Sequence, residues 1–150
     1  MRVTSSVSVA LLIAFLAACG GEGNADSADM QSATITAQRS VRITAPATGD
    51  TVPGPNVSVR VEASGFTVVA AGDTTPNSGH LHLFLDRDLS AAGVPIPVEP
   101  GFIIHLGTGA TDYVIENVAP GEHRLIAVAG DAVHIPLQPW VADTVRFVVR

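Results

Sequence analysis

Lysine is absent from this sequence, and cysteine is nearly so. The 150 residues include 8 basic side chains other than histidine, all of them arginine, and a single cysteine. Without lysine the chain has no Schiff-base chemistry and no lysine general base. One cysteine excludes a disulfide within the chain and any zinc site built from several cysteines.

Positive charge is also scarce. Against 14 acidic residues, the 8 arginines leave a formal net charge of −6. No cluster of basic residues interrupts this acidic background, so we expect neither nucleic acid nor an anionic lipid surface as a partner. The length is that of one domain, and a hydrophobic content of 47% is enough for a substantial core.

The single cysteine ends an apolar segment near the N-terminus. Val7 to Leu16 is an apolar run too short to cross a bilayer as a helix. The sequence Leu16-Ala17-Ala18-Cys19 that closes it resembles the lipobox of bacterial lipoproteins. The resemblance implies a lipoprotein signal peptide over residues 1–18 and a lipid on Cys19, which would attach the protein to a membrane. The alternative is an ordinary secretory signal that happens to contain a cysteine.

A polar stretch follows the cysteine. Residues 20–38 are small, polar and acidic, with almost nothing to bury, so residues 19–38 are predicted to be the lipidated cysteine and a flexible tether. We therefore expect a lipid-anchored protein of the cell envelope. Gly20 stands directly after Cys19, with no aspartate there, which in a host with two membranes favours the outer membrane, facing the periplasm or the cell surface.

Residues 39–150 read as strands and turns. Val57 to Ala63 alternates apolar and polar side chains, as a half-buried strand does, while His123 to Ala129 is apolar on both faces and is expected to be central. No stretch has helical periodicity. We predict an all-β domain, an antiparallel, immunoglobulin-like β-sandwich of about seven to eight short strands, with a small closed barrel as the alternative.

Two histidines stand out on one predicted strand. In His80 to Asp86 three leucines share one face, which we take as the core side, and His80 and His82 share the other. Histidines two apart on a strand can turn toward one metal ion. Alternatively, the two rings simply cap the outer face of the sheet. A second predicted strand, Phe102 to Leu106, places Phe102, Ile104 and Leu106 on one face and His105 on the other.

The order of several short motifs resembles a known family. Gly79-His80-Leu81-His82-Leu83, Ile96-Pro97, His105-Leu106-Gly107, Pro120-Gly121-Glu122-His123-Arg124-Leu125 and His134-Ile135-Pro136 are arranged as in the bacterial family called domain of unknown function 4399. The resemblance covers roughly residues 75–149. It implies a secreted or envelope β-domain with histidine at the five positions His80, His82, His105, His123 and His134. The family usually also has histidine at Leu81 and often at Leu137, so this chain has fewer ligands to offer.

The histidines suggest one candidate site. His80, His82, His105 and His134 can form a site of three or four imidazoles, which suits copper, zinc or nickel. His123 begins a strand beside Leu125 and is expected to bond the backbone of a turn instead. Asp86 shares the face of His80 and His82 and could orient an imidazole or complete the site.

Two functions therefore stand. The first is a lipid-anchored, non-catalytic envelope protein whose β-domain meets a protein or glycan partner. The second is a small lipoprotein that binds copper or zinc through its histidines. Catalysis is not expected, because no Gly-X-Ser-X-Gly elbow presents a nucleophile, and the one cysteine is assigned to lipid.

Overall fold

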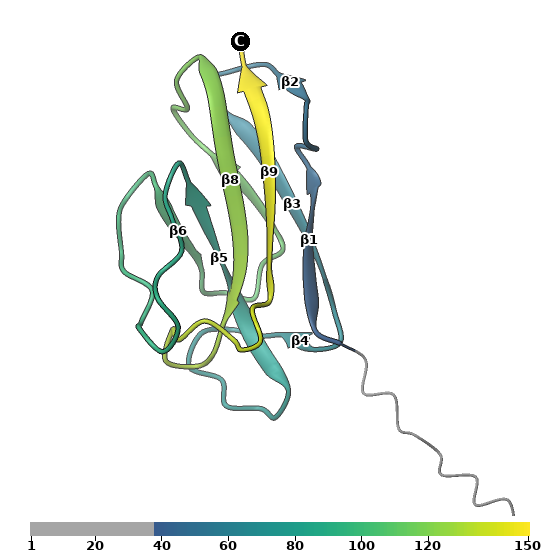
Figure 1. The fold of residues 1–150 in the computed structure, drawn as a ribbon, viewed down its shortest axis with the longest axis vertical. Helices are drawn as coiled ribbons and strands as arrows, with labels where there is room; N and C mark the ends of the chain where they lie inside the picture. The colour runs from purple at the N-terminus through teal and green to yellow at the C-terminus, as the bar shows by residue number, and fades with distance from the viewer. Residues whose placement is uncertain (1–37) are drawn as a thin grey trace, which may run out of the picture. The chain divides into compact units, whose positions relative to one another are not determined.

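A computed structural model describes residues 38–150, which form nine strands and no helix (Figure 1). The strands are β1 Ser40–Ala45, β2 Thr51–Val52, β3 Val57–Ser64, β4 Thr67–Val68, β5 Ser78–Leu85, β6 Ile103–Leu106, β7 Asp112–Ile115, β8 Gly121–Gly130 and β9 Ala142–Val149. This part of the chain contains no helix that is long and apolar enough to cross a membrane. The signal peptide, Cys19 and the tether lie outside the described residues.

The strands form two sheets. The smaller has the order β1-β3-β7, and the larger has the order β2-β9-β8-β5-β4, with β6 paired to β5 as well. The prediction of an all-β fold is confirmed. The prediction of purely antiparallel pairing is wrong, because the two-residue strands β2 and β4 pair in parallel with β9 and β5. Their short length explains why no alternation marked them. The immunoglobulin-like topology stays a prediction.

The main core lies between the two sheets and follows the alternation of the strands. Leu81, Leu83 and Leu85 of β5 pack in one buried cluster with Val59 of β3 and Phe147 of β9. The leucine face of β5 is therefore the core side, as predicted. Burying a side chain of this kind contributes about 1.5–3 kcal/mol to stability relative to leaving it in water.

The opposite face of β5 carries a second, smaller core. Phe84 packs there against Ile126 and Val128 of β8, and Ile96 and Ile103 cover them. Ile96 belongs to the segment 86–101, which folds over the outer face of the larger sheet. As a result β5 is buried on both faces, a feature that three leucines on one face do not predict.

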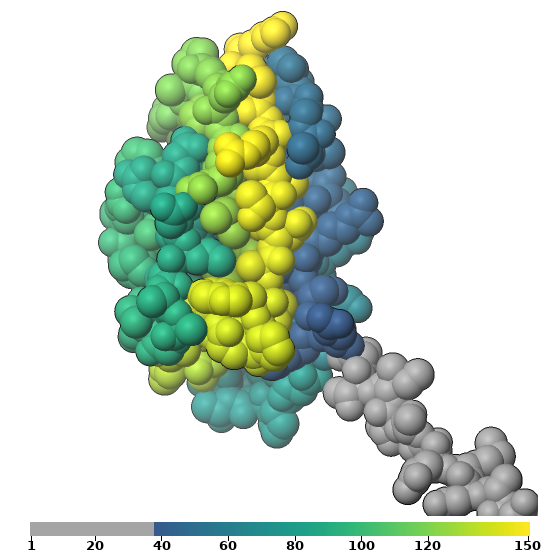
Figure 2. Space-filling model, viewed as in Figure 1, coloured from purple at the N-terminus to yellow at the C-terminus, as the bar shows by residue number. Residues whose placement is uncertain are grey.

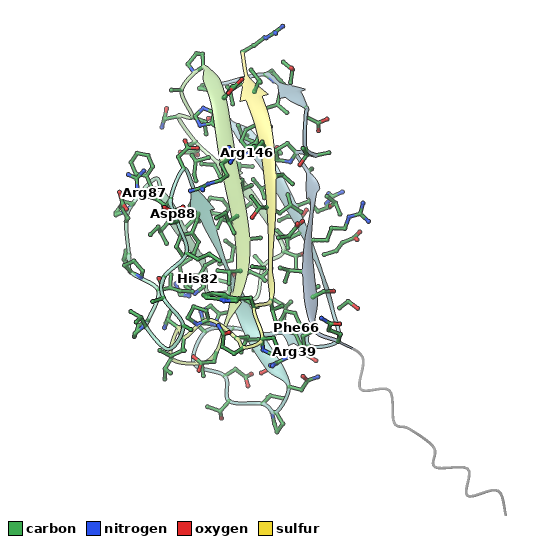
Figure 3. All side chains as sticks on the ribbon, viewed as in Figure 1. Arg39, Phe66, His82, Arg87, Asp88 and Arg146 are labelled. Carbon is green, nitrogen blue, oxygen red and sulfur yellow. The ribbon has the colours of Figure 1, made fainter. Side chains whose placement is uncertain are left out.

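Phe102 was predicted to share a strand face with Ile104 and Leu106, but β6 begins only at Ile103. Ile103, not Phe102, enters the second core, and Phe102 is 39% exposed. The Arg87 guanidinium lies 3.9 Å from the centroid of the Phe102 ring and bonds both oxygens of Glu99. Arg87 and Asp88 lie toward the outer edge of the molecule in Figure 3, whereas His82, also labelled there, is only 2% exposed.

Two loops meet over the outer face of the larger sheet. The segment 86–101 and the loop 131–141 lie side by side in the lower half of Figure 2. The Ile96 N–H donates a hydrogen bond of 2.9 Å to the His134 carbonyl and so joins them. Beneath them, a Cβ on Gly79 would stand 2.7 Å from the Gly130 carbonyl oxygen, so glycine permits the close approach of β5 and β8 at this point.

Candidate metal centre

Strand β5 carries the buried half of the site. His80 and His82 are 0% and 2% exposed, on the face opposite the leucines. Residues two apart on a strand stand about 6.6–6.8 Å apart, yet the Nε2 atoms of these two rings are only 3.0 Å apart. The two side chains therefore turn toward a shared point above the strand.

Strand β6 brings the third imidazole. His105 is the direct cross-strand partner of His82, and their rings stack with centroids 4.9 Å apart and an interplanar angle of 19°. The ring of His105 folds back over Gly107, where an added Cβ would stand 2.4–3.0 Å from three of its atoms. The missing side chain of Gly107 therefore makes room for this orientation of the His105 ring.

The fourth imidazole, that of His134, lies on the loop between β8 and β9. His134 has a φ of 68°, a left-handed conformation that costs a non-glycine residue free energy. The Asp131 carboxylate holds this loop, because its Oδ1 accepts hydrogen bonds from the Val133 and Ile135 N–H groups at 3.0 and 2.8 Å. The His134 N–H donates to the Asp131 carbonyl at 3.0 Å. Asp131 thus fixes the turn from which His134 faces the sheet.

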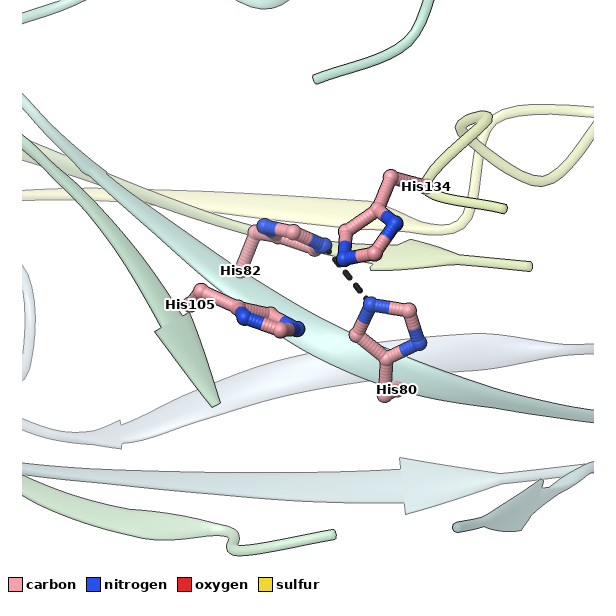
Figure 4. Close-up of side chains that lie close together, drawn as sticks. All are labelled: His80, His82, His105 and His134. Carbon is pink, nitrogen blue, oxygen red and sulfur yellow. Dashed lines mark hydrogen bonds between the residues drawn. The ribbon is translucent and has the colours of Figure 1, made fainter. Parts of the chain in front are cut away.

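Together the four side chains form an imidazole cluster, defined as His80, His82, His105 and His134 (Figure 4). One ring nitrogen from each lies within 4.8 Å of the others. The rings on β5 are buried, His134 is half-buried and His105 is exposed, so the cluster is reached from the His105 side. The cluster combines residues from two strands and one loop.

Burial keeps the inner imidazoles neutral. It is the largest cause that lowers the pKa of His80 from 6.5 to about 4 and the pKa of His82 to about 3, and the neighbouring histidines lower both further. Partial desolvation, followed by the proximity of His134, also lowers the pKa of His105. Neutral imidazole is the form that binds metal ions, so these nitrogens are available as ligands near neutral pH.

The hydrogen bonding of the inner pair is incomplete. The Nδ1 atoms of His80 and His82 are buried without a partner, and their Nε2 atoms face one another across 3.0 Å. With both rings neutral, only one of the two can donate in that contact. Leaving a buried polar group unsatisfied costs about 1–3 kcal/mol, and such groups in a native fold call for an explanation such as an ion or a water.

The fifth histidine and Asp86 form a separate pair. His123 bonds the Asp86 carboxylate through Nδ1 at 2.7 Å and the Ala119 carbonyl through Nε2 at 2.8 Å. The expectation that His123 bonds a turn backbone is confirmed. Asp86 does orient an imidazole, but it is that of His123 and not one of the four; Asp86 follows β5 with a φ of 54°. Asp86 and His123 instead line a surface hollow of about 530 Å³ together with Arg124 and Arg146.

The structure brings all four predicted histidines together, and it adds two supporting residues that sequence reasoning missed. Gly107 and Asp131 hold His105 and His134 in place without belonging to the set. Each stands two or three residues from its histidine, and that proximity was the only signal. Glycine and aspartate are common in turns for other reasons, so proximity alone did not single them out.

The fold and the cluster define the class of this protein: an all-β domain with four converging imidazoles on the covered face of its larger sheet. The family model described as Domain of unknown function (DUF4399) matches residues 59–150, more than half of the chain. The chain therefore belongs to the DUF4399 family, and the match begins earlier than the resemblance at residues 75–149 suggested.

Comparisons beyond the family add little. No curated protein matches the sequence. Among solved structures, the chain is similar to the crystal structure of an engineered protein, with 14% identity and a TM-score of 0.41. That similarity covers 75% of this chain and 20% of the engineered protein, so the chain spans about a fifth of its length.

Proposed function

We propose that this protein binds a transition-metal ion, zinc or copper, through the imidazole cluster, as a non-catalytic protein anchored to the cell envelope. The observation that carries the proposal is the convergence of four ring nitrogens within 4.8 Å. Four of the five histidines in the chain take part, from segments up to 54 positions apart (134 − 80). Imidazole nitrogen is a preferred ligand of zinc, copper and nickel.

A purely structural role explains the cluster less well. Two buried imidazoles whose Nδ1 atoms lack partners weaken the fold relative to apolar side chains of similar size. The second core next to them shows that the same face can be filled with isoleucine, valine and phenylalanine. With an ion bound by the Nε2 atoms, the same two imidazoles would serve as ligands, and the free energy of binding would offset what their burial costs.

The anchoring part of the proposal rests on the sequence of the N-terminal segment. The lipobox-like residues up to Cys19 and the polar stretch after them support a lipid anchor and a tether. A flexible chain of the length of residues 19–38 has a root-mean-square span of about 25 Å. That span is enough to hold the domain that begins at β1 clear of lipid headgroups.

Elemental analysis tests metal binding directly. We would purify the protein in detergent with its N-terminal segment in place and measure zinc and copper per chain. We expect one ion per chain, and a loss of it in the double variant His80→Gln/His82→Gln. The matched control is His123→Gln, a histidine outside the cluster, which is expected to keep the ion.

Thermal unfolding provides the second measurement. An ion that binds only the native state raises its stability by about 2.7 kcal/mol at a concentration one hundred times its Kd. No bound metal, together with no change in melting temperature on adding zinc or copper, would overturn the proposal. The protein would then be best described as an interaction domain for an envelope protein or glycan, with the histidines as packing residues.

A further inference from the structure

The centroids of the four imidazole rings are nearly equally spaced. The six distances between ring centroids are 4.8, 4.9, 4.8, 4.9, 5.4 and 4.7 Å. Four points whose six separations are nearly equal stand at the corners of a tetrahedron. Neither four points in a plane nor a chain of stacked rings gives six similar distances.

The size of this tetrahedron matches that of a metal complex. With metal–nitrogen bonds of about 2.0–2.1 Å, the centroids of four imidazoles stand about 5 Å apart in a tetrahedral complex. In a square-planar complex, opposite rings would stand about 6 Å apart, with the same bond length. The longest centroid distance in the cluster, between His82 and His134, is 5.4 Å. The arrangement therefore agrees with tetrahedral rather than planar coordination.

The nitrogen atoms of the inner pair also stand near the spacing of a metal complex. Neighbouring ligand atoms of a tetrahedral zinc ion stand about 3.3 Å apart. The Nε2 atoms of His80 and His82 are 3.0 Å apart, and the ligand atoms of the whole cluster lie within 4.8 Å of each other. The rings of His105 and His134 would have to turn to bring their ligand atoms from within 4.8 Å to about 3.3 Å of the others.

We propose that the imidazole cluster is a closed tetrahedral site for Zn(II), in which the ion fastens the loop 131–141 to the outer face of the larger sheet. This inference rests on the proposed metal-binding function and specifies its ion and its role. Zinc takes four nitrogen or sulfur ligands in tetrahedral geometry when its role is structural. Copper(II) and nickel(II) favour square-planar or tetragonal arrangements, which the rings do not make.

Copper(I) accepts tetrahedral sites but is selected by softer ligands. Thiolate and thioether groups provide that selection, and residues 38–150 contain neither cysteine nor methionine. Four neutral imidazoles leave the full charge of a divalent ion in place, and the net charge of −6 on the chain favours holding it.

The ion would fasten the loop 131–141 because one of its ligands, His134, lies on that loop. His134 is the only member of the cluster on a loop, and its carbonyl accepts the Ile96 N–H at 2.9 Å. An ion bound to His134 and to the inner pair on β5 would thus tie the loop 131–141 to the sheet. Through Ile96 it would also steady the segment 86–101, which covers the second core.

Affinity alone does not identify the ion, because nitrogen sites generally bind copper(II) more tightly than zinc whatever their geometry. The test is therefore geometric. Cobalt(II) replaces zinc and absorbs visible light much more strongly in tetrahedral than in octahedral coordination. We would load the full chain with one equivalent of cobalt(II), record the visible spectrum, and displace the cobalt with zinc.

We expect a strong tetrahedral spectrum that one equivalent of zinc abolishes. We also expect zinc to slow amide hydrogen exchange in residues 131–141. His134→Gln is expected to weaken the cobalt spectrum and to remove this slowing while the other three ligands still bind an ion more weakly. His123→Gln is the control that should change neither measurement.

Three outcomes contradict the inference in different ways. Cobalt that binds with the weak spectrum of octahedral coordination would overturn the closed tetrahedral site and leave metal binding intact. A tetrahedral spectrum without slower exchange in the loop would overturn the fastening role. No bound cobalt, zinc or copper by elemental analysis would overturn the metal-binding function itself.

Discussion

His80 and His82 place their Nε2 atoms 3.0 Å apart on a face of β5 where both side chains are excluded from water. Both rings are held neutral there, and neither Nδ1 atom finds a partner. The fold therefore keeps two polar groups at a position where apolar ones would be more stable.

Replacing the inner pair by leucine should separate stability from binding. The double variant His80→Leu/His82→Leu removes the unsatisfied nitrogens and fills the space with apolar atoms. Without metal, the variant is expected to have a free energy of unfolding about 1 kcal/mol higher than that of the wild type. It is also expected to bind no metal. Urea unfolding in the presence of a chelator measures the first effect. A variant that is less stable than the wild type would show that the imidazoles serve the fold.

Acid should destabilise the metal-free protein over a defined range of pH. The pKa values of His80 and His82 fall from 6.5 to about 4 and about 3 on folding. Below pH 6.5 the unfolded chain therefore binds more protons than the folded protein, until the pH falls below the folded-state pKa values. The free energy of unfolding should be unaffected by these groups above pH 6.5 and should decrease as the pH falls toward 4. Two groups together give a slope of up to about 2.7 kcal/mol per pH unit.

The leucine double variant is the control for this pH dependence. Urea unfolding at a series of pH values, with chelator present throughout, should show the decrease in the wild type and lose most of it in the variant. Equal slopes in the two proteins would mean that other groups, such as the carboxylates, cause the acid sensitivity.

Adding one methyl group at Gly107 should disturb His105 alone. The new Cβ in Gly107→Ala would overlap the His105 ring, which can swing outward because it is exposed. We expect metal affinity to fall about tenfold or more, equivalent to about 1.4 kcal/mol, with little change in the unfolding of the metal-free protein. Competition with a chelating dye measures the affinity. The neighbouring variant Thr108→Ala, on the same turn, should leave it unchanged.

Removing the Asp131 carboxylate should release His134. In Asp131→Ala the Val133 and Ile135 N–H groups lose their acceptor, so the left-handed conformation of His134 is no longer supported. We expect weaker zinc binding and faster hydrogen exchange in the loop. Asp131→Asn keeps a carbonyl oxygen at the same position and should restore most of both. Failure of asparagine to restore them would point to the charge of Asp131 as the important property.

Much of the site could be predicted from the sequence because it depends on local alternation. Two histidines at i and i+2 on a strand must share a face, and three leucines between and after them fix which face is the core. The family pattern supplied His105 and His134 as further candidates. Their convergence depends on pairing β6 beside β5 and on folding a loop back, and neither is visible in a single stretch of sequence.

The predictions that were wrong also depended on contacts between segments far apart in the sequence. Phe102 was placed on one strand face with Ile104 and Leu106, but β6 begins only at Ile103, which packs in the second core on the opposite face. The pairings of β2 and β4 involve two residues each, too few for any periodic signal. Long-range contacts of loops and short strands are decided by the whole fold rather than by local pattern.

The pairing of β5 with β6 also bears on the order in which the chain assembles. Three of the four imidazoles lie within residues 78–106, where β5 and β6 are close in sequence and pair antiparallel. An ion captured by these two strands would already be in place when β8, the following loop and β9 arrive. His134, on the loop that follows β8, would then be the last ligand to reach the ion.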